Sequence, residues 1–180
     1  MSEPVAALIR GINVGGRSTL SMAGLRSALS ASGFPDARTY LQSGNLVLTA
    51  DSEDTRQLAG ALEQIIQDRF GLSVRVVIRT RAELEDVIGR NPYLEPGMPP
   101  TSLHVIFLES APDGAKVTDL DPGRSPTDRF TVSEREIFLH YPQGSGRSKL
   151  NLDYFERMLG VRGTARNWNT VGKLAGMLGG

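Results

Sequence analysis

The chain has 180 residues, of which 39% are hydrophobic and 22% charged, and its formal net charge is zero. These values are typical of a globular protein. The balanced charge argues against a protein that covers nucleic acid without sequence preference, because such a protein is expected to be basic. Cysteine is absent, which excludes disulfides, thiol nucleophiles and thiolate metal sites. No apolar run approaches the roughly 18 residues of a membrane-spanning helix, so we expect a cytoplasmic protein. A chain of 180 residues suffices for one large domain or two small ones.

Apolar periodicity and turn residues divide the first half of the chain into seven elements. The expected elements are a strand at 5–10, a helix capped by Ser21 and ended by Gly33, strands at 37–42 and 46–50, a helix capped by Ser52, a strand at 72–79, and a helix opened by the capping box Thr80–Glu83. The two middle strands are joined at Ser43-Gly44-Asn45, because Gly and Asn tolerate the positive φ of a tight hairpin.

The second half repeats this order of elements after a segment rich in Pro and Gly at residues 95–100. The expected elements are a strand at 103–108, a weak helix at 112–120, hairpin strands at 129–133 and 137–141, a helix capped by Ser148, a short strand at 161–165, and a last helix through residues 171–178. Each half reads β-α-β-β-α-β plus an extra helix, which is the ferredoxin-like order. We therefore expect an α+β fold with mainly antiparallel sheets, built as tandem ferredoxin-like subdomains at 1–91 and 92–180.

A glycine-rich loop between the first strand and the first helix is the first candidate site. Gly15 and Gly16 allow a ligand to approach the backbone, and Arg10 and Arg17 could donate charge-assisted hydrogen bonds, with Asn13 between them. The spacing matches neither a Walker A loop nor a dinucleotide fingerprint. The loop therefore either binds an anion or only turns the chain.

A polar segment before the last helix is the second candidate site. Trp168, the only tryptophan, offers a flat face for stacking, and Arg166 and Lys173 place charge near a helix N-terminus, where the macrodipole disfavours cations. Either Asn167 or Asn169 can cap the helix, which leaves the other free to contact a ligand. The alternative is a buried Trp that fixes the last helix, with solvated charges around it.

The hairpin residues Ser43 and Asn45 form a third candidate site, although turn chemistry alone accounts for Gly44 and Asn45. The two histidines, His104 and His140, fall inside strand patterns and are interpreted as strand residues. Carboxylates do not show metal-ligand spacing. We assign no catalytic residue, metal or cofactor from the sequence.

Three motifs together carry a resemblance to a known family. They are the runs Ala7–Gly16, Thr39–Asn45 and Ala165–Leu174, in the expected order and spread over nearly the whole chain. With these motifs the chain resembles the bacterial family called domain of unknown function 1697. The family usually has a lysine after its double glycine, where this chain has Arg17, so the positive charge is kept. The resemblance implies a two-subdomain, ferredoxin-like protein and no assigned biochemistry.

The leading functional hypothesis is a cytoplasmic binder of a phosphorylated or otherwise anionic small ligand, with nucleotides among the candidates. Its two motifs would meet in space and share one pocket. One alternative is an enzyme acting on a small anionic substrate, with Lys173 or Lys149 as the working cation. Another is a nucleic-acid-associated protein, because residues 142–180 carry six basic against two acidic side chains and Trp168 could stack on bases. A scaffold without a ligand is the fourth, and the oligomeric state is not predicted.

Overall fold

The computed structural model describes residues 2–16, 18–50 and 54–179, and it divides into two compact units. Unit 1 comprises Met1–Glu85 and Leu174–Gly180, and unit 2 comprises Asp86–Lys173. The divisions fall inside two helices rather than in loops, namely α3 and α6. Each unit has its own sheet and its own hydrophobic core.

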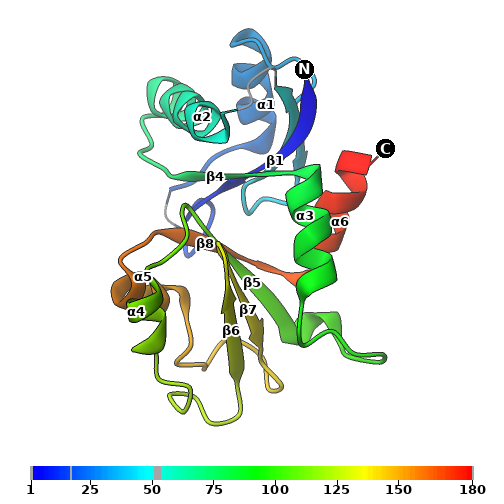
Figure 1. The fold of residues 1–180 in the computed structure, drawn as a ribbon. Coiled ribbons are helices and arrows are strands. Elements are labelled where there is room, and N and C mark those ends of the chain that lie inside the picture. Colours follow the sequence, from blue (N-terminus) through cyan, green and yellow to red (C-terminus); the bar gives the residue numbers. More distant parts are fainter. Residues whose placement is uncertain (1, 17, 51–53, 180) are drawn as a thin grey trace. The chain divides into compact units, whose positions relative to one another are not determined.

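Unit 1 contains a four-stranded sheet in the order β2-β3-β1-β4, with every neighbouring pair antiparallel. Its elements in chain order are β1 (Glu3–Ile9), α1 (Met22–Ala31), β2 (Arg38–Tyr40), β3 (Asn45–Ala50), α2 (Thr55–Phe70), β4 (Val76–Thr80) and the start of α3 (Arg81–Arg90). Figure 1 shows α1 and α2 beside this sheet, and apolar side chains from both helices join alternate residues of the strands in one core.

The α1 stripe predicted from helical spacing is confirmed, because Leu25 and Leu29 are fully buried in this core. Alternation also decides the strand faces, since Ala7 and Ile9 of β1 point into the same core. Burial of the apolar stripes of α1 and α2 against one sheet face therefore holds unit 1 together.

Local side-chain chemistry starts the helices of unit 1. The Ser21 hydroxyl accepts from the Gly24 N–H at 3.1 Å, so the predicted cap of α1 is confirmed. The capping box before α3 is also confirmed: the Glu83 N–H donates to the Thr80 hydroxyl at 3.2 Å, and the Thr80 N–H donates to the Glu83 carboxylate at 2.8 Å.

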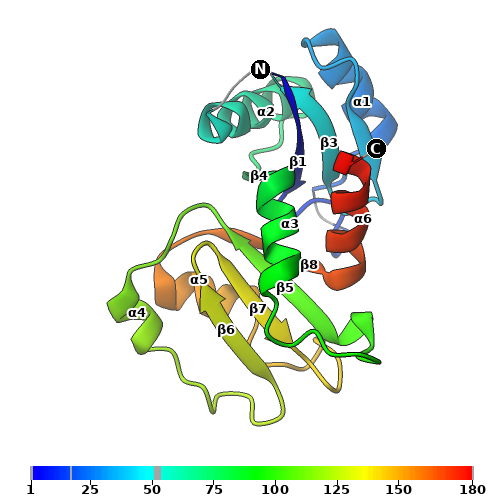
Figure 2. The ribbon, with the colours of Figure 1, turned by 45° about the vertical axis from the view of Figure 1, so that its right-hand side comes forward.

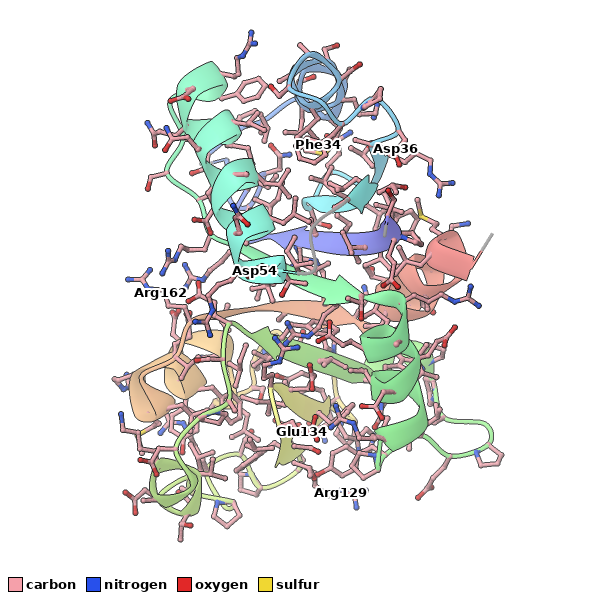
Figure 3. All side chains as sticks on the ribbon, turned by 45° about the horizontal axis from the view of Figure 1, so that its top comes forward. Phe34, Asp36, Asp54, Arg129, Glu134 and Arg162 are labelled. Atoms are coloured by element: carbon pink, nitrogen blue, oxygen red, sulfur yellow. The ribbon has the colours of Figure 1, made fainter. Side chains whose placement is uncertain are left out.

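The start of α2 differs from the prediction. Its N-cap is Asp54, labelled in Figure 3, whose carboxylate accepts from the N–H groups of Arg56 and Gln57 at 2.9 and 3.1 Å. The prediction that Ser52 caps this helix was wrong, and Ser52 itself lies outside the described residues. A carboxylate cap also complements the positive end of the helix dipole.

The hairpin of unit 1 is present, but its turn is longer than predicted. Tyr40 pairs with Asn45 across the four residues Leu41–Gly44, and positive φ values occur at Leu41 (60°) and Gly44 (88°). Asn45 is the first residue of β3, is fully buried, and donates to the Tyr40 carbonyl at 2.9 Å and to the Ser43 hydroxyl at 3.1 Å. The prediction that Asn45 is a turn residue with a positive φ was therefore wrong.

Unit 2 contains a second four-stranded antiparallel sheet, in the order β6-β7-β5-β8. Its elements are the end of α3, the 3₁₀ turn η1 (Pro100–Ser102), β5 (Leu103–Leu108), α4 (Gly114–Thr118), β6 (Arg129–Ser133), β7 (Glu136–His140), α5 (Leu152–Leu159), β8 (Gly163–Asn167) and the start of α6 (Trp168–Gly179). Figure 2 shows α5 beside this sheet, and Phe155 and Leu159 of α5 are buried in a core with Ile106 of β5. The turn between β6 and β7 carries Glu134, labelled in Figure 3, with φ 55°.

Two helix starts in unit 2 refine the sequence predictions. The N-cap of α5 is Asn151, which accepts from the Tyr154 N–H at 3.0 Å, so Ser148 as the cap was wrong. Ser148 instead accepts from the Leu150 N–H at 3.1 Å. At α6 the amide oxygen of Asn167 accepts from the Thr170 N–H at 2.9 Å, which makes Asn167 the capping asparagine.

Across the described residues the fold is therefore a mixed α+β arrangement of two four-stranded antiparallel sheets and six α-helices. In the part of the chain that the structure describes, every helix is too short or too polar to cross a membrane.

Candidate functional site

The glycine-rich loop of unit 1, residues 10–20, connects β1 to α1 and is called here the β1–α1 loop. Its backbone takes the left-handed conformation at Gly11, Asn13, Gly15, Gly16 and Ser18, with φ between 50° and 73°. Gly15 and Gly16 are exposed, and a Cβ at either position would stand in open space. The loop therefore presents its backbone to solvent at these glycines. Arg17 lies outside the described residues.

Asn13 determines the shape of this loop. Its side-chain oxygen accepts from the Leu20 N–H at 2.8 Å, and its amide group donates to the carbonyls of Leu20 at 2.9 Å and Gln42 at 2.6 Å. The Asn13 side chain thus closes the loop and joins it to the β2–β3 turn. The predicted candidates Asn13, Ser43 and Asn45 all have hydrogen bonds within the protein at these positions.

The β2–β3 turn also packs directly on the β1–α1 loop. The Ile9 N–H donates to the Gly44 carbonyl at 2.8 Å, and a Cβ at Gly44 would stand 2.9 Å from two side-chain atoms of Ile12. Two of the sequence motifs are therefore neighbours in unit 1. Arg10, whose N–H donates to the Arg75 carbonyl at 2.9 Å, starts the same loop.

An open groove of about 510 Å³ lies where this loop and turn meet the start of α1. We call it the α1 pocket, and its lining consists of residues 19–23, Arg26 one turn further along α1, Asn13, and Thr39, Leu41 and Gln42 of the hairpin. The Arg26 guanidinium donates to the Thr39 hydroxyl across the groove. The volume falls in the range of small-molecule sites, about 300–1,000 Å³.

The α1 pocket has positive character. Among the described residues that line it, Arg26 is the sole ionisable side chain. The first turn of α1 contains no acidic residue, so the partial positive charge of the helix start is not neutralised locally. Met22 and Ala23 are the first two residues of α1, and N–H groups at these positions have no acceptor within the helix. Such a surface favours an anion.

Three residues of this groove were not predicted from the sequence: Arg26, Thr39 and Gln42. A local signal existed for Arg26. This cation follows a first helical turn that contains no acidic residue, and the helix macrodipole disfavours a positive charge near the helix start. The contribution of Thr39 and Gln42 depends on the hairpin folding back against α1, which no local pattern encodes.

The second predicted group lies in unit 2. Arg166 is only 8% exposed, and its guanidinium donates to the Thr164 hydroxyl at 2.6 Å and to the Ala165 carbonyl at 2.8 Å. Burial lowers the pKa of Arg166 to about 10. Trp168 begins α6 and is partly buried, whereas Asn169 and Lys173 are exposed. The prediction that this group shares a pocket with the β1–α1 loop stays a prediction.

The two histidines lie in strands, as predicted: His104 in β5 and His140 in β7. Within the described residues, the buried Nδ1 atom of each ring has no hydrogen-bond partner. Burial lowers the pKa of His104, whose ring packs edge-on against Tyr141 at 5.1 Å between centroids. Across residues 2–16, 18–50 and 54–179, no group of three or more His, Cys, Asp or Glu side chains is arranged to hold a metal ion.

Comparison with solved structures supports the mixed α+β fold of this chain. A solved structure described as a conserved bacterial protein from Streptococcus pneumoniae is 22% identical, covers 99% of both chains and has a TM-score of 0.74. The sequence model of the family described as "Protein of unknown function (DUF1697)" matches residues 2–138. The chain belongs to this family, and the resemblance found in the sequence is confirmed. A search of curated proteins found no match.

Proposed function

We propose that this protein binds a small phosphorylated or otherwise anionic ligand, and that the anionic group lies in the α1 pocket of unit 1. The observation that carries the proposal is the charge of this groove: Arg26 is the sole ionisable side chain among its described lining residues, and it lies beside the uncompensated start of α1. An anion there would accept hydrogen bonds from Arg26 and from the first amides of α1.

The neighbouring β1–α1 loop extends the proposed site. Gly15 and Gly16 are exposed, and their left-handed backbone allows close approach of a ligand without a side chain in the way. The role proposed for Asn13 is positional, because its amide holds the loop against the hairpin that forms the other wall of the groove. Arg10, the first residue of the loop, would add to the positive potential, and Arg17 of the same loop stays a candidate for this role.

The expected affinity for the anionic group alone is modest. Three charge-assisted hydrogen bonds contribute about 1.5–3 kcal/mol each, from which the cost of association removes several kcal/mol. The remainder corresponds to a dissociation constant on the order of 1 mM. A test must therefore cover millimolar ligand concentrations.

A thermal-shift screen of nucleotides and sugar phosphates, followed by calorimetry, tests the proposal. We expect at least one compound to raise the melting temperature of the wild type and to lose this effect in Arg26→Gln. The matched control is Arg56→Gln, which removes an exposed cation from the first turn of α2 in the same unit. A screen without a hit, or hits that Arg26→Gln leaves unchanged, would contradict the proposed function.

We also propose that the fold is a tandem pair of ferredoxin-like subdomains, at 1–91 and 92–180. The support is that both sheets have the same relative strand order, β2-β3-β1-β4 and β6-β7-β5-β8, and that an additional helix follows the last strand of each.

The proposed location is the cytoplasm, since a chain without cysteine does not need an oxidising compartment to fold.

A further inference from the structure

One wall of the α1 pocket carries an exposed apolar side chain. Leu41 is 54% exposed. The other large hydrophobic residues that are exposed, among the described residues, are Val14 and Leu94. Leu41 lies in the pocket lining together with Arg26. The groove therefore combines a cationic group with an apolar surface that the protein itself does not cover.

The other large apolar residues of the lining are already used by the fold. Leu20 and Met22 are buried in the core of unit 1. A ligand in the groove would thus find most of its apolar contact at Leu41. Val14, which is 62% exposed, follows Asn13, and the Asn13 amide donates to the carbonyl of Gln42, next to Leu41. Among the described residues of unit 1, the two exposed large apolar residues are therefore on joined segments.

The size of the groove adds a further argument. A bare phosphate or a comparable ion would occupy a small part of about 510 Å³, whereas this volume suits a ligand with an organic group of some size. Apolar surface gains free energy when a ligand covers it. A sugar phosphate would place hydroxyl groups against Leu41, and that contact would add no favourable free energy to binding.

Building on the proposed function, we propose that the α1 pocket binds a phosphate monoester of an aromatic or alkyl group, with the phosphate at Arg26 and the apolar group on Leu41. The ligand class is thereby distinguished from inorganic phosphate and from phosphate esters of polyols. Recognition depends on two separable contacts, one ionic and one apolar.

Calorimetric titration of the full-length protein with phenyl phosphate, glycerol 1-phosphate and inorganic phosphate tests this inference. We expect phenyl phosphate to bind the wild type roughly tenfold more tightly than glycerol 1-phosphate, the ratio typical of a small apolar contact. In Leu41→Asn the two esters should bind equally, with the affinity for glycerol 1-phosphate unchanged. Asn tolerates the left-handed backbone of this position, and Leu41→Gly provides a second variant that also accepts it.

The controls separate this inference from the proposed function. Leu94→Asn removes an exposed apolar side chain of unit 2 and should keep the tenfold ratio, whereas Arg26→Gln should weaken both esters to a similar extent. If Leu41→Asn keeps the preference for phenyl phosphate while Arg26→Gln weakens both esters, the inference is overturned and the proposed function stands. If Arg26→Gln changes neither ester, the proposed function fails and the inference with it. A wild-type dimer in sedimentation that Leu41→Asn dissociates would assign Leu41 to a second copy of the chain and overturn the inference.

Discussion

At the scale of single residues, Gly44 is the position where the β2–β3 turn depends most on the absence of a side chain. Its φ is +88°, and a Cβ would stand 2.9 Å from Ile12 atoms and 3.0 Å from the Ile9 Cβ. We expect Gly44→Ala to lower the free energy of unfolding by about 2–4 kcal/mol, because backbone strain and overpacking add. Urea denaturation measures this effect.

The matched control for this substitution is Gly33→Ala. Gly33 also has a positive φ, +99°, but its Cβ would meet nothing within 4 Å. Only the conformational cost applies there, about 1–2 kcal/mol. Equal losses at the two positions would show that the turn is not packed on Ile12 as described.

His104 is the residue for which the structure predicts a pH dependence of stability. Burial lowers its pKa below the ordinary value of 6.5, so the folded protein favours the neutral ring. The unfolded chain then binds more protons below about pH 6.5, and the free energy of unfolding falls as the pH drops from there toward the lower, folded pKa. Above pH 6.5 the contribution of the neutral ring is fully present.

His104→Phe tests this dependence, because Phe keeps a ring against Tyr141 and removes the titrating group. We expect a shallower loss of stability between about pH 7 and 4.5 than in the wild type, measured by urea denaturation at each pH. Since the Nδ1 atom of His104 is buried without a partner among the described residues, stability at pH 7 should be maintained. Parallel pH profiles for both proteins would refute the assignment.

At the scale of elements, the start of α5 distinguishes two candidate caps. We expect Asn151→Ala to lower the free energy of unfolding by about 1 kcal/mol, because the Tyr154 N–H loses its acceptor. Ser148→Ala should cost less than about 0.5 kcal/mol, since Ser148 lies outside the helix. Urea denaturation of both variants compares the two costs, and the reverse order would return the cap to Ser148.

Helix starts show which part of the fold was predictable from the sequence. Ser21 and the Thr80–Glu83 capping box were predicted because their hydrogen bonds span only three residues. The start of α5 was not, because Leu150 is fully buried and its carbonyl accepts from the Tyr141 hydroxyl at 2.6 Å. That contact, nine residues apart, keeps the segment before Asn151 out of the helix.

Part of the candidate site was also predictable from the sequence, and part of it was not. The glycines of the β1–α1 loop and the hairpin turn each carry a local signature, and the structure makes them neighbours through the Asn13–Gln42 hydrogen bond. Arg26 was missed because its position against Thr39 depends on how α1 lies relative to the hairpin. Contacts of this kind follow from tertiary packing rather than from a motif.

At the scale of the whole molecule, unit 1 is built from two separate stretches of the chain. Its second stretch is Leu174–Gly180, which includes the last residues of α6, and there the Met177 carbonyl accepts from Arg38 of β2 at 3.0 Å. Leu178 is buried in this stretch. The stability of the first sheet should therefore depend on a residue close to the C-terminus.

Hydrogen exchange measured strand by strand tests this dependence. We expect Leu178→Ala to lower the protection of the β1 and β3 amides by about 2–4 kcal/mol, the usual cost of truncating a buried leucine, with a smaller effect on β5 and β7. The matched variant Leu159→Ala, in the core of unit 2, should show the opposite pattern, because local opening follows the cooperative unit that a side chain supports. If Leu178→Ala instead lowers the protection of the β5 and β7 amides, the end of α6 supports the second half of the chain. A division between residues 91 and 92 would then describe folding better than the two compact units do.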